Sequence, residues 1–407
     1  MMTKKYLKRI KFLLAGIWAI PSVLFLRFLR PFVLVRFGAI RSNRVGHFVT
    51  DACEQKALSY KEREVANRPT VNWYWVPDDT SNNQWALMVK RELPVNKAVR
   101  YLDFWNQKIA GGATHTIPAT ENSRDTKGLF ENYNATFCFT SEENERARQW
   151  LLSIGYQEGE KFICVLVRDP IFLANDALLK EEYGGPVNKW SYHNYRDSDI
   201  DTYLEGLEWL ADQGVWVFRM GKKMARPIKT KHARILDYSF SEYRSDFLDV
   251  WLFANCSFCI STSTGPDQLS AIYGRSILYL NATPLGHLTS YYNCMWVPKT
   301  AAWQKTGEPL TLNETLRNTY FSSSFYQDVG IELQDLSSSE IKLYIQEFWS
   351  RYKGLWVDSL IEQSMHDRFW ATLEDWKDYR NYHDWRHDQC RVSSEWLKKQ
   401  SQKFLEN

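Results

Sequence analysis

The sequence predicts an α/β protein with two doubly wound domains, and three observations favour this class. Apolar runs of strand length alternate with segments of helical periodicity along most of the chain. Glycine or polar residues follow these runs repeatedly, as is typical of the carboxyl ends of parallel strands. The length of 407 residues exceeds what one ordinary hydrophobic core holds. We therefore expect two Rossmann-like domains facing a cleft, flanked by an N-terminal amphipathic segment and a helical C-terminal tail.

The composition narrows the class of protein. A hydrophobic content of 44% and a charged content of 24% are those of a folded protein. The net charge of +3 implies no general affinity for nucleic acid, so no nucleic-acid partner is expected. Seven cysteines, an odd number, indicate reduced thiols in a cytosolic protein.

Two pairs of metal-binding residue types have suggestive spacings. Cys256 and Cys259 have CxxC spacing, but they lie in an apolar run without a second pair, which favours core packing over metal binding. His383 and His387 are spaced i, i+4 without a third ligand nearby in sequence, and we expect them on the surface. We therefore expect neither a metal nor a cofactor.

Residues 1–30 form a segment that we expect to lie outside both domains. The first eleven residues carry five lysines and arginines, and an apolar run from Phe12 to Leu26 follows. A basic amphiphile with Trp and Phe suits the anionic cytoplasmic face of a membrane, so we expect a peripheral protein on the inner face of the cytoplasmic membrane. A helix packed on the body of the protein and a tilted signal anchor stay open as alternatives.

The first domain is expected to span residues 31–156. Residues 32–37 and 71–76 have the composition of strands, and residues 101–109 the pattern of an amphipathic helix. Ser141 is the expected N-cap of a further helix. The loop after the first strand carries His47.

The second domain is expected over residues 157–338. Four runs predict buried strands, at residues 162–167, 215–220, 256–260 and 276–280. Ser198 and Asp201 predict a helix start resembling a capping box, and hydroxyls before Pro266 predict another capped start. After Pro284 the sequence shows no regular strand or helix pattern. Residues 339–407 predict a helical C-terminal extension.

Polar residues follow three strands of the second domain. They are Arg168 and Asp169 after the first, Arg219 and Gly221 at the second, and Ser261, Thr262, Ser263, Thr264 and Gly265 after the third. The carboxyl ends of parallel strands meet at one edge, so we expect these groups to gather there. Arginine forks and loop amides suit a diphosphate. Simple helix capping and surface salt bridges are the alternative interpretation.

Several other functions lack their sequence signatures. No GxGxxG follows the first strand of either domain, which disfavours a dinucleotide oxidoreductase. The phosphate-binding signature GxxxxGK[ST] and the nucleophile motif GxSxG are absent as well. Sugar transfer from a nucleotide donor at a membrane surface fits the remaining features.

Particular stretches of the sequence resemble a known family. The segment from Asn194 to Pro284 contains YRDSDIDTYLEGLEWLADQGVWVFRMGKK and YRSDFLDVWLFANCSFCISTSTGPDQLSAIYGRSILYLNATP. It resembles bacterial glycosyltransferases of surface-polysaccharide gene clusters, and RVGH at 44–47 and VSSEWL at 392–397 match as well. The resemblance covers residues 30–400. It implies the two-Rossmann GT-B architecture, distantly similar to lipopolysaccharide heptosyltransferases and O-fucosyltransferases.

The resemblance implies a donor on the second domain, an acceptor on the first and no obligatory metal. This sequence has Ser263-Thr264-Gly265 where the family varies around Ser-Gly, so the hydroxyl that contacts phosphate stays open. The family gives no donor sugar, and the capsule and lipopolysaccharide pathways are both compatible with it.

The resulting hypothesis is a metal-independent glycosyltransferase of hexosyl or related type. Its expected partners are a nucleotide-sugar, a glycan or lipid-linked acceptor, and the membrane surface. His47 is the candidate general base, with Asp169 in reserve; the alternative for His47 is a backbone-bonded loop histidine. A non-catalytic, membrane-attached nucleotide-sugar-binding scaffold is the rival function.

Overall fold

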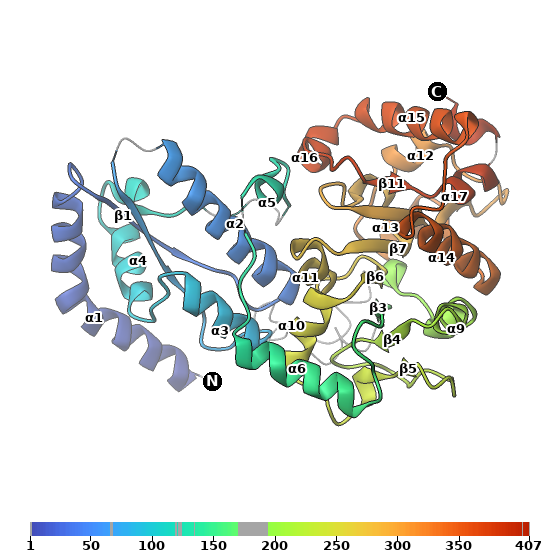
Figure 1. Ribbon diagram of the computed structural model, residues 1–407. Helices are drawn as coiled ribbons and strands as arrows, with labels where there is room; N and C mark the ends of the chain where they lie inside the picture. The colour runs from blue at the N-terminus through green and yellow to red at the C-terminus, as the bar shows by residue number, and fades with distance from the viewer. Residues whose placement is uncertain are drawn as a thin grey trace. The chain divides into compact units, whose positions relative to one another are not determined.

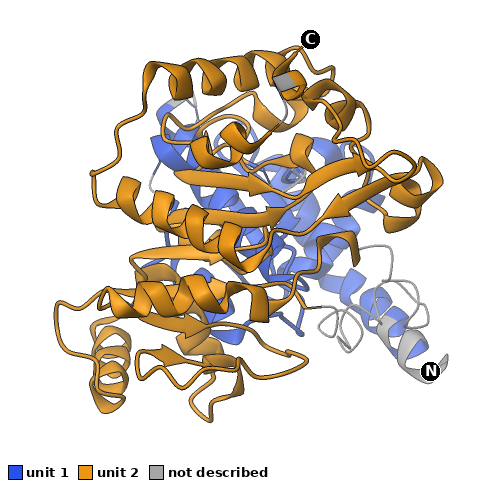
Figure 2. Cartoon of the chain, turned by 90° about the vertical axis from the view of Figure 1, so that its right-hand side faces the viewer, with its two compact units in different colours: residues 1–124, 129–139 blue, residues 125–128, 140–407 orange. Residues whose placement is uncertain are grey.

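A computed structural model (Figure 1) describes residues 2–65, 68–118, 120, 124–133, 135–169, 194–400 and 402–406. The chain divides into two compact units, coloured separately in Figure 2. Unit 1 comprises residues 1–124 and 129–139, and unit 2 comprises residues 125–128 and 140–407. The sequence predicted the boundary between the domains at residue 156. In the structure, residues 140–156 belong to unit 2.

Unit 2 is built on a seven-stranded parallel sheet in the order β11-β8-β7-β6-β3-β4-β5. The strands are β3 (Phe162–Leu166), β4 (Trp216–Arg219), β5 (Ile235–Leu236), β6 (Phe258–Ser261), β7 (Ser276–Ala282), β8 (Cys294–Pro298) and β11 (Arg391–Val392). Every residue of β3, β4 and β6 is buried, which explains their continuous apolar runs. The α/β class and all four strands predicted for this domain are confirmed.

Helices cover this sheet and connect its strands. They include α6 (Ser141–Ser153), α9 (Leu204–Asp212), α10 (Asp246–Asn255), α11 (Asp267–Ile272), α12 (Leu312–Arg317), α13 (Ser323–Asp328), α14 (Ser338–Tyr352), α15 (Leu360–Glu374), α16 (Tyr379–His383) and α17 (Ser394–Lys399). The strands β9 (Thr300–Trp303) and β10 (Ile331–Gln334) form a separate antiparallel pair. At Gly206, a Cβ would lie 2.6 Å from Cδ1 of Ile345, so glycine lets α9 approach α14 closely.

Helix α6 belongs to unit 2 because its apolar side packs there. The rings of Trp150 and Phe218 lie 5.7 Å apart, and the Trp251 indole donates to Asn144 at 3.0 Å. The N-cap is Thr140, one residue before the predicted Ser141, and Thr140 forms a reciprocal capping box with Glu143. The predicted cap at Ser198 is wrong as well: Asp199 caps the short helix that precedes α9.

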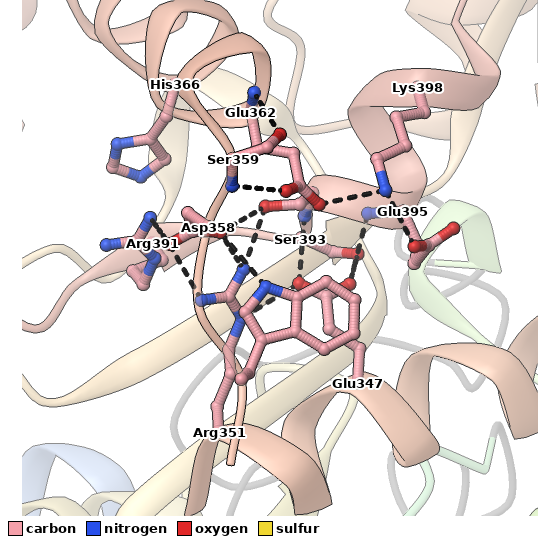
Figure 3. Close-up of polar contacts among 12 residues, drawn as sticks. Glu347, Arg351, Asp358, Ser359, Glu362, His366, Arg391, Ser393, Glu395 and Lys398 are labelled. Carbon is pink, nitrogen blue, oxygen red and sulfur yellow. Dashed lines mark hydrogen bonds and ion pairs between the residues drawn. The ribbon is translucent and has the colours of Figure 1, made fainter. Parts of the chain in front are cut away.

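The C-terminal residues complete unit 2 and are fastened by a polar cluster (Figure 3). The strand β11 extends the sheet by pairing with β8, so the tail after residue 339 contains a strand as well as helices. The side chain of Glu347, in α14, accepts from the Ser394 amide at 2.9 Å, the Glu395 amide at 3.1 Å and the Ser393 hydroxyl. The Arg351 guanidinium donates to the same carboxylate at 2.9 Å. We call this group, with Asp358 and Arg391, the C-terminal clasp.

Asp358 is the second acid of the clasp. Arg351 binds it in a bidentate manner at 2.6 and 3.0 Å, and Arg391 donates to it at 2.6 Å. Burial alone would raise the pKa of Asp358, but these arginines hold it well below its usual range. Asp358 therefore stays ionised at neutral pH and joins α14 to β11.

His383 also packs inside unit 2. It is fully buried, its Nε2 lies 3.1 Å from the Gly286 carbonyl and its Nδ1 lies 2.8 Å from the Ser290 hydroxyl. The carbonyl can only accept, so Nε2 donates, and in the neutral ring Nδ1 accepts from Ser290. The prediction that His383 is a surface residue is wrong, because both ring nitrogens are used in joining α16 to the loop before β8.

Unit 1 contains a smaller parallel pair of strands, β1 (Leu34–Ala39) and β2 (Thr70–Trp75). Single parallel bridges, from Phe37 to Thr116 and from Tyr74 to Val95, extend the pair on its outer edges. The helices are α1 (Met2–Phe28), α2 (Val45–Val65), α3 (Asn83–Glu92), α4 (Val99–Lys108) and α5 (Leu129–Asn132). Both strands and the helix predicted for this region are confirmed within two residues.

The N-terminal segment is one continuous helix, α1, and not a separate appendage. Ala19 and Val23 are fully buried in a cluster with Val35, Phe37, Val99 and Leu102. The stretch Arg9–Phe28 is long and apolar enough to cross a membrane by length and composition. The expectation that residues 1–30 lie outside the domains is therefore replaced by a helix that contributes to the core of unit 1.

Candidate functional site

The order in which the chain adds strands to the sheet of unit 2 reverses between β3 and β6. From β3 the chain proceeds to β4 and β5 on one side, and it then returns to β6 on the other side of β3. The loops that leave β3 and β6 consequently diverge, and ligands of such sheets bind at this point, beyond the carboxyl ends of the strands. Arg168 and Thr262, which follow these two strands, lie at this switch point.

The backbone and side chain of Arg168 are both fixed at this edge. Its amide donates to the Thr262 hydroxyl at 2.9 Å, which joins the loops after β3 and β6. Its Nε donates to Asp197 Oδ1 at 3.0 Å. Burial, and after it the positive charge of Arg196, lowers the pKa of Arg168 to about 10.

Arg196 brings a second guanidinium to the same place. It donates through Nη2 to the carbonyl of Ser263, whose backbone is left-handed with φ 58°. Its buried Nε has no hydrogen-bond partner among the described residues. Burial also raises the pKa of Asp197, which disfavours the charge of the carboxylate beside Arg168. Arg168 is thus paired with a weakly compensating acid, while the neighbouring Arg196 donates to a backbone carbonyl, and this arrangement favours an incoming anion.

Lys299 is the third cation at this edge of the sheet, after Arg168 and Arg196. It follows β8, its side chain is 5% exposed, and its Nζ donates to the Asp197 carbonyl at 2.8 Å. Asp335 Oδ1 lies 2.6 Å from the same ammonium. Because this ion pair is satisfied within the protein, Lys299 acts by fixing the turn that carries Arg196 and Asp197.

The hydroxyl-rich loop is organised by an acid and not by hydroxyl caps. Pro266 occupies the N-cap position of α11 without a side-chain bond. The fully buried Asp267 accepts from the Ser261 hydroxyl at 2.6 Å and from the Thr264 amide at 2.7 Å. Burial raises the pKa of Asp267 to about 6. The predicted capping by Ser and Thr is wrong, because Pro266 occupies the N-cap position and Asp267 binds the loop from the first residue of the helix.

This bonding sorts the predicted loop residues into two groups. Ser261 and Thr262 are buried, and their hydroxyls are engaged by Asp267 and by the Arg168 amide. Ser263, Thr264 and Gly265 are partly exposed. Within the described part of the chain, the amides of Ser263 and Gly265 have no acceptor. The partly exposed half of the loop is thus the half available to a ligand.

Arg219 is buried in the interior of unit 2. Its side chain is 1% exposed, and its Nη1 donates to Asp237 Oδ2 at 3.1 Å and to the Arg226 carbonyl at 2.8 Å. Its Nε and Nη2 are buried without a partner among the described residues. The structure therefore places Arg219 against the loop between β4 and β5, apart from the described contacts of Arg168 and Arg196.

Gly221 lies in the loop between β4 and β5, and Asp169 binds to the same loop. The backbone of Gly221 has φ +152°, which disfavours any residue with a side chain, and a Cβ there would lie 2.4 Å from Met224 Sδ. Asp169 Oδ2 accepts from the Ala225 amide at 2.8 Å, which connects the end of β3 to the loop after β4. Asp169 is partly exposed.

Asn281 supports the arginine turn from β7. It is fully buried with a left-handed backbone, φ 52°. Its Nδ2 donates to the Ser198 hydroxyl at 3.0 Å and to the Tyr203 hydroxyl at 3.3 Å, and its Oδ1 accepts from the Leu336 amide at 2.8 Å. Asn281 thus holds the turn that follows Arg196 and Asp197.

We expect Asn281→Ala to lower the free energy of unfolding by about 2–3 kcal/mol, because buried partners are left unsatisfied. Left-handed backbone also disfavours alanine. Urea denaturation measures the loss, with the exposed Asn381→Ala as the matched control. An Asn281→Ala protein as stable as the control would contradict the supporting role of this residue.

His47 belongs to unit 1. It lies in the first turn of α2, after the carboxyl end of β1, and is partly buried. In the same region the Arg41 guanidinium pairs with Asp51 at 3.0 Å and donates to the Thr120 carbonyl at 2.6 Å. His47 therefore lies at the carboxyl edge of the unit 1 sheet, within a helix and not in the loop that the sequence predicted.

Sequence reasoning missed Arg196, Asp197, Asn281 and Lys299. Arg196 and Asp197 lie far from any strand end in sequence, so the strand-end rule gave no signal for them. Asn281 did give one, as a polar residue inside an apolar strand. Lys299 follows the run CMWVP directly, and the same rule would have found it had residues 294–298 been read as a strand.

No family model matches the sequence, and no curated protein matches it. Similar solved structures include Escherichia coli ADP-heptose LPS heptosyltransferase II, with 11% identity, TM-score 0.35, and coverage of 61% of this chain and 86% of that chain. E. coli heptosyltransferase WaaC with ADP has 13% identity and TM-score 0.37, with coverage of 79% and 100%. A family 9 glycosyl transferase from Veillonella parvula has 10% identity and TM-score 0.37, with coverage of 62% and 82%.

These neighbours are heptosyltransferases and a family 9 glycosyltransferase, the class that the sequence resemblance named as distant relatives. The similarity at these TM-scores is too low to assign a function. The residues of unit 2 therefore carry the functional conclusion.

Proposed function

We propose that this chain is a glycosyltransferase whose unit 2 binds the diphosphate of a nucleotide-sugar. The observation that carries the proposal is the pair of neighbouring guanidinium groups at the switch point of the sheet: Arg168 is paired with Asp197, whereas Arg196 donates to the Ser263 carbonyl. Planar guanidinium groups bind phosphate oxygens through paired hydrogen bonds. The amides of Ser263 and Gly265 would supply further donors to the same anion.

The transfer step follows from this placement. The acceptor hydroxyl loses its proton to a base while its oxygen bonds to the anomeric carbon of the sugar. The bond from that carbon to the phosphate oxygen breaks, and the nucleoside diphosphate leaves with the electron pair. Arg168 and Arg196 would stabilise the negative charge that develops on the leaving group, the larger part of catalysis in this scheme.

The acceptor is assigned to unit 1. His47, at the carboxyl edge of the unit 1 sheet, is the proposed general base, because the ordinary pKa of histidine suits proton removal near neutrality. Asp169 is the alternative base, although its bond to the Ala225 amide gives it a structural role. We propose a glycan or lipid-linked acceptor in surface-polysaccharide synthesis and transfer of a hexosyl or related group.

The proposal is tested by incubating the full-length protein with a panel of nucleotide-sugars and measuring release of nucleoside diphosphate. We expect one donor to be hydrolysed slowly without acceptor and faster with an acceptor extract. Because arginines would neutralise the diphosphate, excess EDTA should leave at least about half of the rate. Binding of a donor without release in any arm would favour the non-catalytic scaffold, and a rate that requires added Mg²⁺ would overturn metal independence.

A further inference from the structure

Helix α1 presents two apolar faces, and only one of them is covered in unit 1. Ala15, Ala19 and Val23 recur at helical spacing and are buried against the core. The opposite face carries large apolar side chains that are exposed; they are Tyr6, Leu7, Ile10, Leu13, Leu14, Ile17, Leu24, Phe25 and Phe28. Ile17 is 78% exposed and Phe28 is 75% exposed. An apolar stripe of this length is unusual on a soluble surface and indicates a binding site.

The covered face is fastened to α4 between Phe12 and Arg27, and Figure 1 shows the two helices side by side. In the middle of α1, the Trp105 indole donates to the Phe12 carbonyl at 3.0 Å, and its ring lies so close to Gly16 that a Cβ there would be 2.8 Å away. Near the end, the Arg27 guanidinium donates to Asn106 Oδ1 at 2.7 Å and to the Ala110 carbonyl at 2.7 Å. A helix held in this way cannot cross a bilayer without breaking these contacts.

Charge identifies what covers the exposed face. Residues 1–30 contain seven basic residues and no aspartate or glutamate; they are Lys4, Lys5, Lys8, Arg9, Lys11, Arg27 and Arg30. At 100° per residue, the exposed Arg9 and Lys11 lie on opposite flanks of the stripe centred on Ile17. Basic flanks beside an apolar face match an anionic lipid surface, whereas a second copy of the chain would bring like charges together.

We propose that α1 docks unit 1 onto an anionic bilayer, lying in the plane of the interface with its outward face in the lipid. The covered face stays packed on α4, so docking requires no rearrangement of unit 1. The apolar side chains enter the headgroup boundary, and the flanking cations meet lipid phosphates. This surface is independent of the donor site in unit 2, so either can be correct without the other.

The test is cosedimentation of the full-length protein with vesicles of phosphatidylcholine, either alone or with one third phosphatidylglycerol. The variant Leu13→Gln/Ile17→Gln/Phe28→Gln should lower partitioning onto the anionic vesicles by at least about 100-fold. The reason is that three apolar side chains that would enter the lipid are lost. The variant Arg9→Gln/Lys11→Gln should lower it at least about tenfold and remove most of the preference for anionic lipid. Circular dichroism checks that each variant is folded.

The matched control lies in unit 2, at the start of α15 and just before it. Val357→Gln/Leu360→Gln/Ile361→Gln changes side chains that are 73% to 90% exposed, and its partitioning should stay within about twofold of wild type. Equal loss in the control and the α1 variant would overturn the assignment to α1. Wild-type protein that ignores both vesicles, or that forms a dimer which the α1 variant cannot form, would overturn the lipid partner. Protein that alkaline carbonate fails to extract would overturn in-plane docking.

Discussion

Replacing Arg168 and Arg196 together by alanine is expected to reduce sugar transfer by at least about 100-fold, because both donors to the leaving diphosphate are lost. Arg168 is held by Asp197 and Arg196 by the Ser263 carbonyl, so each fork is already oriented at the edge of the sheet. Such oriented groups stabilise developing charge without reorganisation, which is why their removal affects rate strongly. Rates of nucleoside diphosphate release measure the effect.

Two further variants keep this prediction decisive. Arg168→Lys retains the charge but loses the planar fork, so we expect an intermediate rate if Asp197 stays paired. Arg234→Ala is the matched control, because Arg234 pairs with Glu160 at 2.6 Å just before the strands of the same sheet begin, at its amino edge. Its rate should equal that of wild type. A folded double-alanine protein with wild-type rate would end the assignment of the site.

Glu347→Ala is expected to cause the largest loss of stability, about 3–5 kcal/mol, because it breaks a buried ion pair and leaves its partners unsatisfied. The Glu347 carboxylate is fully buried and receives the amides of Ser394 and Glu395 at the start of α17. Without it, the first two amides of α17 lose their acceptor, and Arg351 keeps Asp358 as its acidic partner. Urea denaturation followed by tryptophan fluorescence measures the change.

The control for this prediction is Glu332→Ala, an exposed glutamate in β10 of the same unit. Its effect should stay within about 0.5 kcal/mol, as for most surface substitutions. Glu347→Gln keeps one carbonyl acceptor and should give an intermediate loss. Equal stability of Glu347→Ala and Glu332→Ala would show that the C-terminal clasp does not hold the tail of unit 2.

The sequence predicted the sheet of unit 2 well where strands are buried on both sides. Buried parallel strands require continuous apolar runs, and β3, β4, β6 and β7 show them. The strand β8 escaped prediction because Cys294 and Met295 are not typical strand residues and Pro298 is depleted in strands. The short β11 has only two residues, and long-range pairing with β8 decides its conformation.

In the candidate site too, some residues could be predicted from sequence order and others depend on the tertiary fold. Arg168 and the loop after β6 follow strands directly, so sequence order alone placed them at one edge. Asp267 was not predicted as the organiser of that loop, because a carboxylate bonded to Ser261 and Thr264 depends on how the loop folds back. Arg196 reaches the site from a separate turn, and its contact with Ser263 spans 67 residues of sequence. Contacts of this kind depend on the tertiary fold.

The most direct test of the central claim is backbone amide hydrogen exchange of the full-length protein, with and without a saturating nucleoside diphosphate. The donor site at the carboxyl edge of unit 2 predicts slower exchange in residues 194–199 and 261–266, where Arg196, Ser263 and Gly265 lie. Ligand binding stabilises the elements that it contacts, so protection should concentrate there. Protection confined to other segments, by a nucleotide that demonstrably binds, would contradict the account.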